Sequence, residues 1–139
     1  MTDEELLKQM EEGAGFFHHN NYHVEKAVPG DVIVRVDLTE DSMNPYGIAH
    51  GGIIFGLGDV VMGMLAKGTG RKAVTLDANI NYLRPGVGKY LKGQGEIIKD
   101  GNATCILQTS IYDDQERLVA VMRGTYYYIE QRKKESYEW

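Results

Sequence analysis

The sequence has 139 residues and 42% hydrophobic residues, a length that fits one domain, residues 1–139, with enough chain to bury a core. The formal net charge of -5 excludes general attraction to nucleic acid, and the single cysteine excludes a disulfide framework and suits a reducing compartment. Because no apolar run is long enough to cross a bilayer and the acidic N-terminus is unlike a signal peptide, we expect a cytoplasmic protein with neither nucleic-acid nor membrane partners.

The N-terminal part of the chain predicts little regular structure. Residues 1–20 contain a predicted short helix, residues 2–12, followed by a connection that breaks helical periodicity. Residues 24–28 predict the start of an extended run before a turn at Pro29-Gly30. Residues 32–36 predict a strand, because Val32, Val34 and Val36 alternate with other residues.

Residues 51–67 predict a helix, since apolar side chains recur at three- and four-residue spacings. The opposite side carries small residues and a single charge, Asp59. A helix that is apolar or small on every side is normally buried all round. Interior glycines each cost about 1 kcal/mol relative to alanine, so tertiary packing must hold this helix. These glycines are Gly52, Gly56, Gly58 and Gly63.

The second half of the chain predicts an antiparallel meander, because apolar and polar residues alternate with a period of two. Asp100-Gly101 is a strong hairpin signal, and the charged tail, residues 130–139, is expected to fray. The predicted strands are residues 74–82, 90–99, 103–112 and 117–129. Antiparallel strands with a segregated helix indicate an α+β fold, in which a sheet wraps around the buried helix.

Asp59 is the first candidate functional residue. A lone carboxylate on a buried helix costs several kcal/mol unless it is paired or lines a polar cavity, and no Lys or Arg lies within two turns. Gly56 and Gly63 are expected to leave open space beside it, through which a thin chain could pass. Two interpretations stay open here: a functional acid, or an aspartate that contacts backbone or solvent at a subunit seam.

Gly51 and Gly52 at the start of the same helix are the second candidate feature. A helix N-terminus presents unpaired N–H groups, and glycine lets a ligand approach them. Such donors can stabilise the oxyanion of an attacked carbonyl, although glycine pairs also serve tight packing. Gly51 precedes Asp59 by eight residues, roughly 12 Å along the axis. A two-fold dimer, with Gly51 of one chain facing Asp59 of the other, would bring them together.

Two stretches carry a family resemblance that covers residues 32–129. The stretch from Asn44 to Asp59, NPYGIAHGGIIFGLGD, closely resembles the hotdog-fold thioesterases of the phenylacetate-pathway (PaaI-like) type, and so does DANINYLRP at residues 77–85. The resemblance implies the hotdog fold, an antiparallel sheet wrapped around a central helix.

The resemblance also implies roles for individual residues. Asp59 would be the catalytic carboxylate, as general base or as nucleophile. Gly51 would donate its backbone N–H to the thioester oxygen, and Asn44 would hold the water or the carbonyl. His50 would orient this loop or assist at the carbonyl. Thr75 would help to position the water, with an ordinary strand threonine as the alternative.

By the same resemblance, CoA lies along the turn after the third strand and along the following hairpin. Arg84 and Lys99 are candidate phosphate contacts, against the alternative of solvated surface residues. One departure is Gly63, which stands where some relatives carry a hydroxyl, so that role is absent or passes to Thr75. The residues implied in CoA binding are Gly52, Tyr82, Leu83, Arg84, Pro85, Lys99, Asp100, Gly101, Asn102 and Thr104.

These observations favour an acyl-CoA thioesterase that acts on a medium-chain or aromatic acyl group and uses neither cofactor nor metal. We expect a homo-oligomer of at least two chains, and the resemblance implies a dimer of dimers. An enoyl-thioester hydratase or dehydratase, and a non-catalytic acyl-CoA-binding module, are the alternatives. His18, His19 and His23 have no accompanying ligand pattern that indicates a metal. The tyrosines at 126–128 are interpreted as packing or dimer-edge residues.

Overall fold

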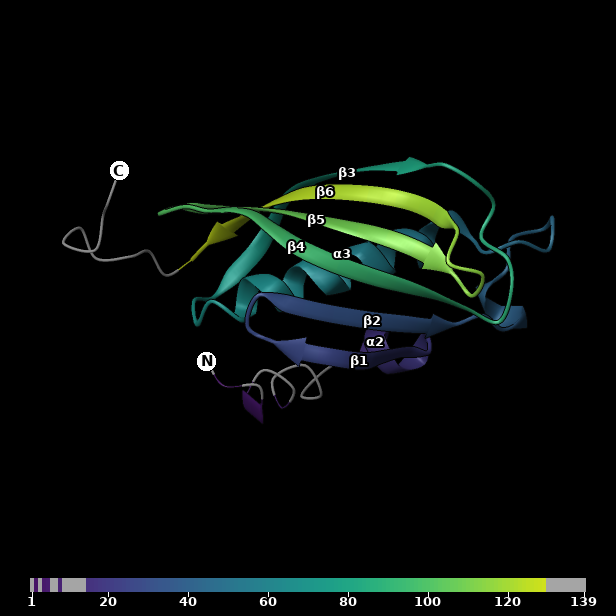
Figure 1. The fold of residues 1–139 in the computed structure, drawn as a ribbon, viewed down its shortest axis with the longest axis horizontal. Helices are drawn as coiled ribbons and strands as arrows, with labels where there is room; N and C mark the ends of the chain where they lie inside the picture. The colour runs from purple at the N-terminus through teal and green to yellow at the C-terminus, as the bar shows by residue number, and fades with distance from the viewer. Residues whose placement is uncertain (1, 3, 6–7, 9–14, 130–139) are drawn as a thin grey trace.

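The computed structural model describes residues 2, 4, 5, 8 and 15–129 (Figure 1). Most of the predicted N-terminal helix and the whole tail, residues 130–139, lie outside the described residues. The elements are α2 (Gly15–His19), β1 (Tyr22–Val28), β2 (Asp31–Asp37), the 3-10 helix η1 (Glu40–Ser42), α3 (Gly51–Lys67), β3 (Ala73–Tyr82), β4 (Tyr90–Asp100), β5 (Thr104–Asp113) and β6 (Leu118–Tyr128).

The strands form one antiparallel sheet of six, in the order β1-β2-β4-β5-β6-β3. Figure 1 shows the strands from β3 to β1 crossing the view one after another, with α3 behind them, between β4 and β2 in this view. The helix packs against β2 to β6. This is the predicted α+β hotdog fold. No helix among the described residues is long and apolar enough to cross a membrane.

The predicted meander is correct for β4, β5 and β6 but wrong for β3. This strand does not pair with β4, which follows it in sequence, but with β6 at the opposite edge of the sheet. The segment after Tyr82 carries the chain back across the end of the sheet, so that β4 pairs with β2. Alternation identifies a strand but not its neighbour, because pairing depends on which face of α3 each strand covers.

A bulge in β3 also changes which side chains face the helix. The register with β6 shifts between Thr75 and Asp77, so the regular alternation expected from residue 74 to residue 82 does not hold. Thr75 points to α3 and donates to Asp59, whereas Val74 and Leu76 are 49% and 61% exposed. A bulge re-aims a side chain in this way. Among the described residues, no strand pairs with the outer edge of β3.

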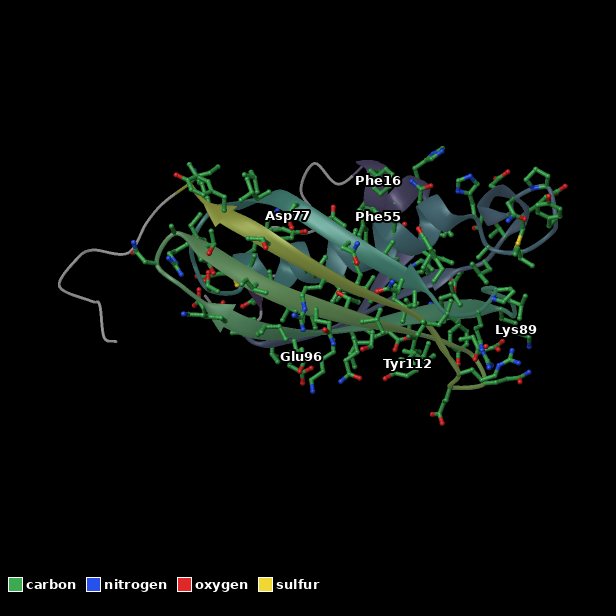
Figure 2. The ribbon with its side chains drawn as sticks, turned by 90° about the horizontal axis from the view of Figure 1, so that it is seen from above. Phe16, Phe55, Asp77, Lys89, Glu96 and Tyr112 are labelled. Carbon is green, nitrogen blue, oxygen red and sulfur yellow. The ribbon has the colours of Figure 1, made fainter. Side chains whose placement is uncertain are left out.

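Two expectations about helices were wrong. Residues 15–19 form the short helix α2, which places Phe17 in the core, and five residues are too few for a periodic signal. The helix α3 is also not buried all round, since Phe55 is 37% exposed on the side that the sheet does not cover. Figure 2 shows Phe55 and Phe16 together on one long side of the molecule.

Hydroxyl groups from the strands hold α3 in place. Its sheet-facing residues, such as Leu57 and Leu65, are fully buried. The buried Thr109 hydroxyl on β5 donates to the carbonyl of Gly58 at 3.1 Å, and that of Tyr22 on β1 donates to the carbonyl of Ile53 at 2.8 Å. Tertiary contacts thus offset the poor helix propensity of this segment.

Candidate active site

Asp59 lies half-buried in the middle of α3, held by two hydroxyl groups of the sheet. The Thr75 hydroxyl on β3 donates to Asp59 Oδ1 at 3.1 Å. The Tyr126 hydroxyl on β6 donates to the same oxygen and lies 2.9 Å from the backbone carbonyl oxygen of Asp59. The lone acid of the helix is therefore anchored by neutral donors rather than by a cation.

The register of the sheet explains why both donors reach one oxygen. Thr75 and Tyr126 are opposite each other in the β3–β6 pair, and the bulge turns Thr75 inward. Burial, and then the negative charge of Asp59, raise the pKa of the Tyr126 hydroxyl well above its ordinary value. The phenol therefore stays protonated at neutral pH and acts as a donor.

The N-terminus of α3 forms the second part of the site. His50 is the N-cap, and its Nδ1 accepts a hydrogen bond from the Gly52 N–H at 2.8 Å. Among the described residues, nothing accepts a hydrogen bond from the Gly51 N–H. The Tyr82 hydroxyl donates to the Gly51 carbonyl at 2.8 Å. Gly51 is thus the amide left for a carbonyl oxygen, and Gly52, an implied CoA contact, has its amide occupied.

Asn44 precedes this N-terminus in a tight loop. Its Oδ1 accepts hydrogen bonds from the N–H groups of Tyr46 at 2.9 Å and Ile48 at 3.3 Å. The Nδ2 amide is then the polar group that remains for a ligand, and it can donate but not accept. A cavity of about 420 Å³ lies here. It is lined by Asn44, Ile48, Ala49, Gly51, Ile54, Tyr82, Leu83, Arg84, Pro85 and Gly86.

The structure thus gathers the predicted residues into two separate groups. Asn44, Gly51 and the turn after β3 line one cavity, and neither Asp59 nor Thr75 is part of its lining. Asp59 lies two helical turns, roughly 12 Å, further along α3. Within one chain, the amide and the carboxylate do not reach the same atom.

The hairpin between β4 and β5, implied in CoA binding, forms a third location. Arg71, in the loop after α3, donates to Asp100 Oδ1 at 2.6 Å and to the carbonyls of Gly101 and Asn102 at 2.9 and 2.8 Å. The hairpin therefore adjoins the C-terminal end of α3, opposite to Gly51. The Lys99 side chain is exposed, and no ion pair of Lys99 occurs within the described part of the chain.

Two interpretations of individual residues are corrected. The space beside Gly56 is not open, because a Cβ there would collide with the Tyr22 hydroxyl. Tyr126 is more than a packing residue, since its hydroxyl reaches Asp59. The sequence does not show which of the three consecutive tyrosines contacts Asp59. Tyr126 is identified by its position opposite Thr75 in the β3–β6 pair. Of the histidines set aside earlier, His23 pairs with Asp37 at 3.0 Å.

An antiparallel sheet around a glycine-rich helix, with a free amide at the helix N-terminus and a hydroxyl-anchored carboxylate in its middle, defines a hotdog-fold protein equipped for acyl chemistry. The family model described as "Thioesterase superfamily" matches residues 46–120. This chain belongs to the thioesterase superfamily and is a thioester hydrolase. The family and the fold confirm the predicted PaaI-like hotdog type.

Individual relatives agree with this family. Acyl-coenzyme A thioesterase 13 of Homo sapiens is 32% identical over 103 residues, which are 71% of this chain and 74% of the human protein. A hypothetical thioesterase protein from Streptococcus pneumoniae, solved with coenzyme A, is 35% identical with a TM-score of 0.76, over 81% of this chain and 92% of that chain. The Escherichia coli PaaI protein from the phenylacetic acid degradation operon has a TM-score of 0.87 over 94% of this chain and 98% of that one, and at 22% identity it shows the fold alone.

Proposed function

We propose that this chain hydrolyses acyl-CoA thioesters at a site shared by two copies of the chain. The observation that carries the proposal is Asp59, a carboxylate anchored through Oδ1 by Thr75 and Tyr126 on an otherwise uncharged helix segment. The human relative is named as an acyl-coenzyme A thioesterase, and the streptococcal relative was solved with coenzyme A. Both names support CoA as the thiol of the substrate.

A further parallel with the streptococcal protein supports the pairing of an acid with a hydroxyl. Alanine mutants of that protein were solved at one aspartate and one threonine, sixteen positions apart. Asp59 and Thr75 have the same separation in this chain.

The proposed chemistry follows from the free groups of the two parts. The Gly51 N–H and the positive end of α3 stabilise the negative charge on the thioester oxygen during attack. The Nδ2 amide of Asn44 donates to the same oxygen or to the attacking water. Asp59 either takes a proton from that water or attacks the carbonyl carbon itself. In the first route the water oxygen bonds to the acyl carbon, the C–S bond breaks, and the CoA thiolate takes up the proton that Asp59 accepted. In the second route Asp59 displaces the thiolate and forms an anhydride, which water hydrolyses to the acid and the free carboxylate. Both routes convert thioester and water into acid and CoA, so the reaction needs no cofactor.

The pairing of two chains through β3 would assemble this site. Thr75 of β3 contacts Asp59, and Tyr82 of the same strand contacts Gly51. If two copies of β3 pair antiparallel about a two-fold axis between Ala78 and Asn79, Thr75 lies opposite Tyr82 of the partner subunit. Asp59 then approaches the partner's Gly51. The ten-residue edge also carries the exposed apolar residues of β3, and such an edge favours pairing.

The same pairing would complete the CoA site. Antiparallel pairing reverses the partner's α3, so the partner's β4–β5 hairpin lies toward the cavity that Arg84 lines. Arg84 of one chain and Lys99 of the other then supply cations to the CoA phosphates. We propose that the complex is a dimer of dimers. The single cysteine is in keeping with a cytoplasmic location.

The acyl group is proposed to be medium-chain or aromatic. Phe16 and Phe55 lie along the side of α3 that the sheet does not cover (Figure 2), and the Phe16 ring approaches to 3.4 Å from the point where a Gly56 Cβ would stand. Gly56 is one turn before Asp59. An apolar surface next to the acid suits an aliphatic or aryl chain better than a polar acyl group.

A hydrolysis panel tests the reaction. Acyl-CoAs from acetyl to decanoyl, together with benzoyl- and phenylacetyl-CoA, are incubated with the protein, and free thiol is measured. We expect release of CoA, highest with medium-chain or aryl substrates, and a loss of kcat of about 10²- to 10⁴-fold in Asp59→Asn. If no substrate releases CoA, the proposal is wrong. A bound but unhydrolysed ligand would then favour a binding module, and hydration of an enoyl-CoA would favour a hydratase.

Mixing two inactive variants tests the shared site. Asn44→Asp keeps the Oδ1 acceptor of the loop but removes the Nδ2 donor, and Asp59→Asn removes the acid. In a two-fold dimer, each mixed dimer contains one intact site, so unfolding and refolding the two together at equal amounts should restore about a quarter of wild-type activity. If both groups act within one chain, the mixture stays as inactive as its components.

A further inference from the structure

We propose that Tyr126 is a positioning residue for hydrolysis: together with Thr75, its hydroxyl holds Oδ1 of Asp59 so that Oδ2 is the oxygen that meets the reactants. The inference rests on the proposed function. It assigns a role to a side chain that the sequence interpretation left to packing.

The two donors converge on one carboxylate oxygen. Thr75 Oγ1 donates to Asp59 Oδ1 at 3.1 Å, and the Tyr126 hydroxyl donates to the same atom. Within the described part of the chain, no donor reaches Asp59 Oδ2. A carboxylate oxygen has two lone pairs, so Oδ1 is fully occupied and Oδ2 keeps both of its own. Oδ2 is therefore the atom left to act as base or nucleophile.

The anchor is rigid because Tyr126 is fixed along its whole length. The residue is 3% exposed on the inner face of β6, directly opposite Thr75 in the sheet. Its hydroxyl also lies 2.9 Å from the Asp59 carbonyl oxygen, which ties the side chain and the backbone of the acid to one group. The last torsion of an aspartate is otherwise broad. A Cβ at Gly63, one turn later, would lie 3.6 Å from the hydroxyl, in ordinary van der Waals contact with it.

The chain contains a matched control for this contact. Tyr22 is 1% exposed, and its hydroxyl donates to the carbonyl of Ile53 in the same helix at 2.8 Å. Both tyrosines thus brace α3 through a backbone carbonyl from inside the sheet. Of these two tyrosines, only Tyr126 donates to the carboxylate of Asp59. Replacing each by phenylalanine removes the same atom and the same kind of structural contact, but only Tyr126→Phe removes a donor from Asp59 Oδ1.

The test compares Tyr126→Phe with Tyr22→Phe in the acyl-CoA assay, with melting temperatures measured in parallel. We expect similar decreases in melting temperature. Tyr126→Phe should lower kcat by about 10- to 100-fold, the range of one hydrogen bond to a charged group, with KM within about twofold. Tyr22→Phe should keep kcat and KM near wild-type values. As a second probe of the same oxygen, Thr75→Val should also lower kcat without raising KM.

The outcomes separate the two proposals. A wild-type protein that hydrolyses no acyl-CoA overturns the proposed function, and the positioning role with it. An active wild type whose Tyr126→Phe variant keeps its kcat overturns the positioning role alone. Equal kcat losses in Tyr126→Phe and Tyr22→Phe also overturn it, because the hydroxyl would then act only through the stability of α3.

Discussion

Replacing Gly56 by alanine is expected to destabilise the protein, although alanine is favoured over glycine in a helix by about 1 kcal/mol. A Cβ at this position would collide with the Tyr22 hydroxyl, and the Cζ of the same ring would be 3.3 Å away. The hydroxyl donates to the Ile53 carbonyl, and Tyr22 is 1% exposed. A displaced Tyr22 hydroxyl would therefore lose this hydrogen bond without gaining one to water.

The magnitude follows from these contacts. A buried hydroxyl without a partner costs about 1–3 kcal/mol, and overpacking costs a similar amount. After subtraction of the gain in helix propensity, Gly56→Ala should lower the free energy of unfolding by about 2 kcal/mol. In a Tyr22→Phe background the collision with the hydroxyl is absent. The remaining neighbours of the Cβ are the Cζ of the residue 22 ring at 3.3 Å and the Phe16 ring at 3.4 Å, and Phe16 is exposed enough to move. There the same substitution should raise stability by up to about 1 kcal/mol.

Urea unfolding of the wild type, both single variants and the double variant measures this sign reversal as a double-mutant cycle. We expect a coupling free energy of about 2–3 kcal/mol. If Gly56→Ala shifts the urea midpoint equally in both backgrounds, the Tyr22 hydroxyl does not contact the helix at Gly56. The space beside Gly56 would then be open to a ligand, as the sequence alone indicated.

Three further predictions concern other charged groups. Burial alone would raise the pKa of Asp113, but hydrogen bonds from Arg117 and Gln115 outweigh burial and hold this pKa below its ordinary value of 3.8. Asp113→Asn should therefore lower the free energy of unfolding at pH 7. In urea titrations, the difference in stability between wild type and variant should vanish as the pH falls below 3.8 and Asp113 takes up a proton. Arg84→Gln should raise KM for acyl-CoA by about 3- to 10-fold at low salt and less at about 0.5 M salt, with kcat unchanged; a salt-independent effect would contradict a phosphate contact. Arg71→Ala should lower the free energy of unfolding by about 2–4 kcal/mol, because the side chain is only 12% exposed and anchors the β4–β5 hairpin. A smaller loss in thermal or urea unfolding would show that the hairpin does not depend on the Arg71 side chain.

The elements of the fold were predictable where the signal is local. The helix at 51–67 agrees with α3 at both ends, since apolar spacing and the flanking glycines mark its limits. The strands agree within two residues for the same reason. Strand order was not predictable, because β3 pairs with β6 across about 50 residues of chain. The bulge after Thr75 also has no local signature, and it reverses which residues face α3.

The candidate site was predictable in its chemistry more than in its geometry. Asp59 is conspicuous as a lone charge, and its distance from Gly51 follows from helix geometry alone. The two-chain site inferred from that distance stays a prediction. The cap formed by His50 was harder to foresee, since serine, threonine, aspartate and asparagine are the usual N-caps. Tyr126 was missed because it is one of three adjacent tyrosines. The partner that it faces is 51 residues earlier in the sequence.

The tyrosines on α3 relate the stability of this fold to its chemistry. Interior glycines weaken the helix, but Gly56 also lets the Tyr22 hydroxyl approach its backbone. At Tyr22 the contact ends at a carbonyl oxygen and affects stability alone. At Tyr126 it extends to the carboxylate, so one hydroxyl both supports a weak helix and orients the acid. A substitution that stiffens α3 elsewhere should therefore restore the melting temperature of Tyr126→Phe without restoring its kcat, because helix stability cannot replace the missing donor.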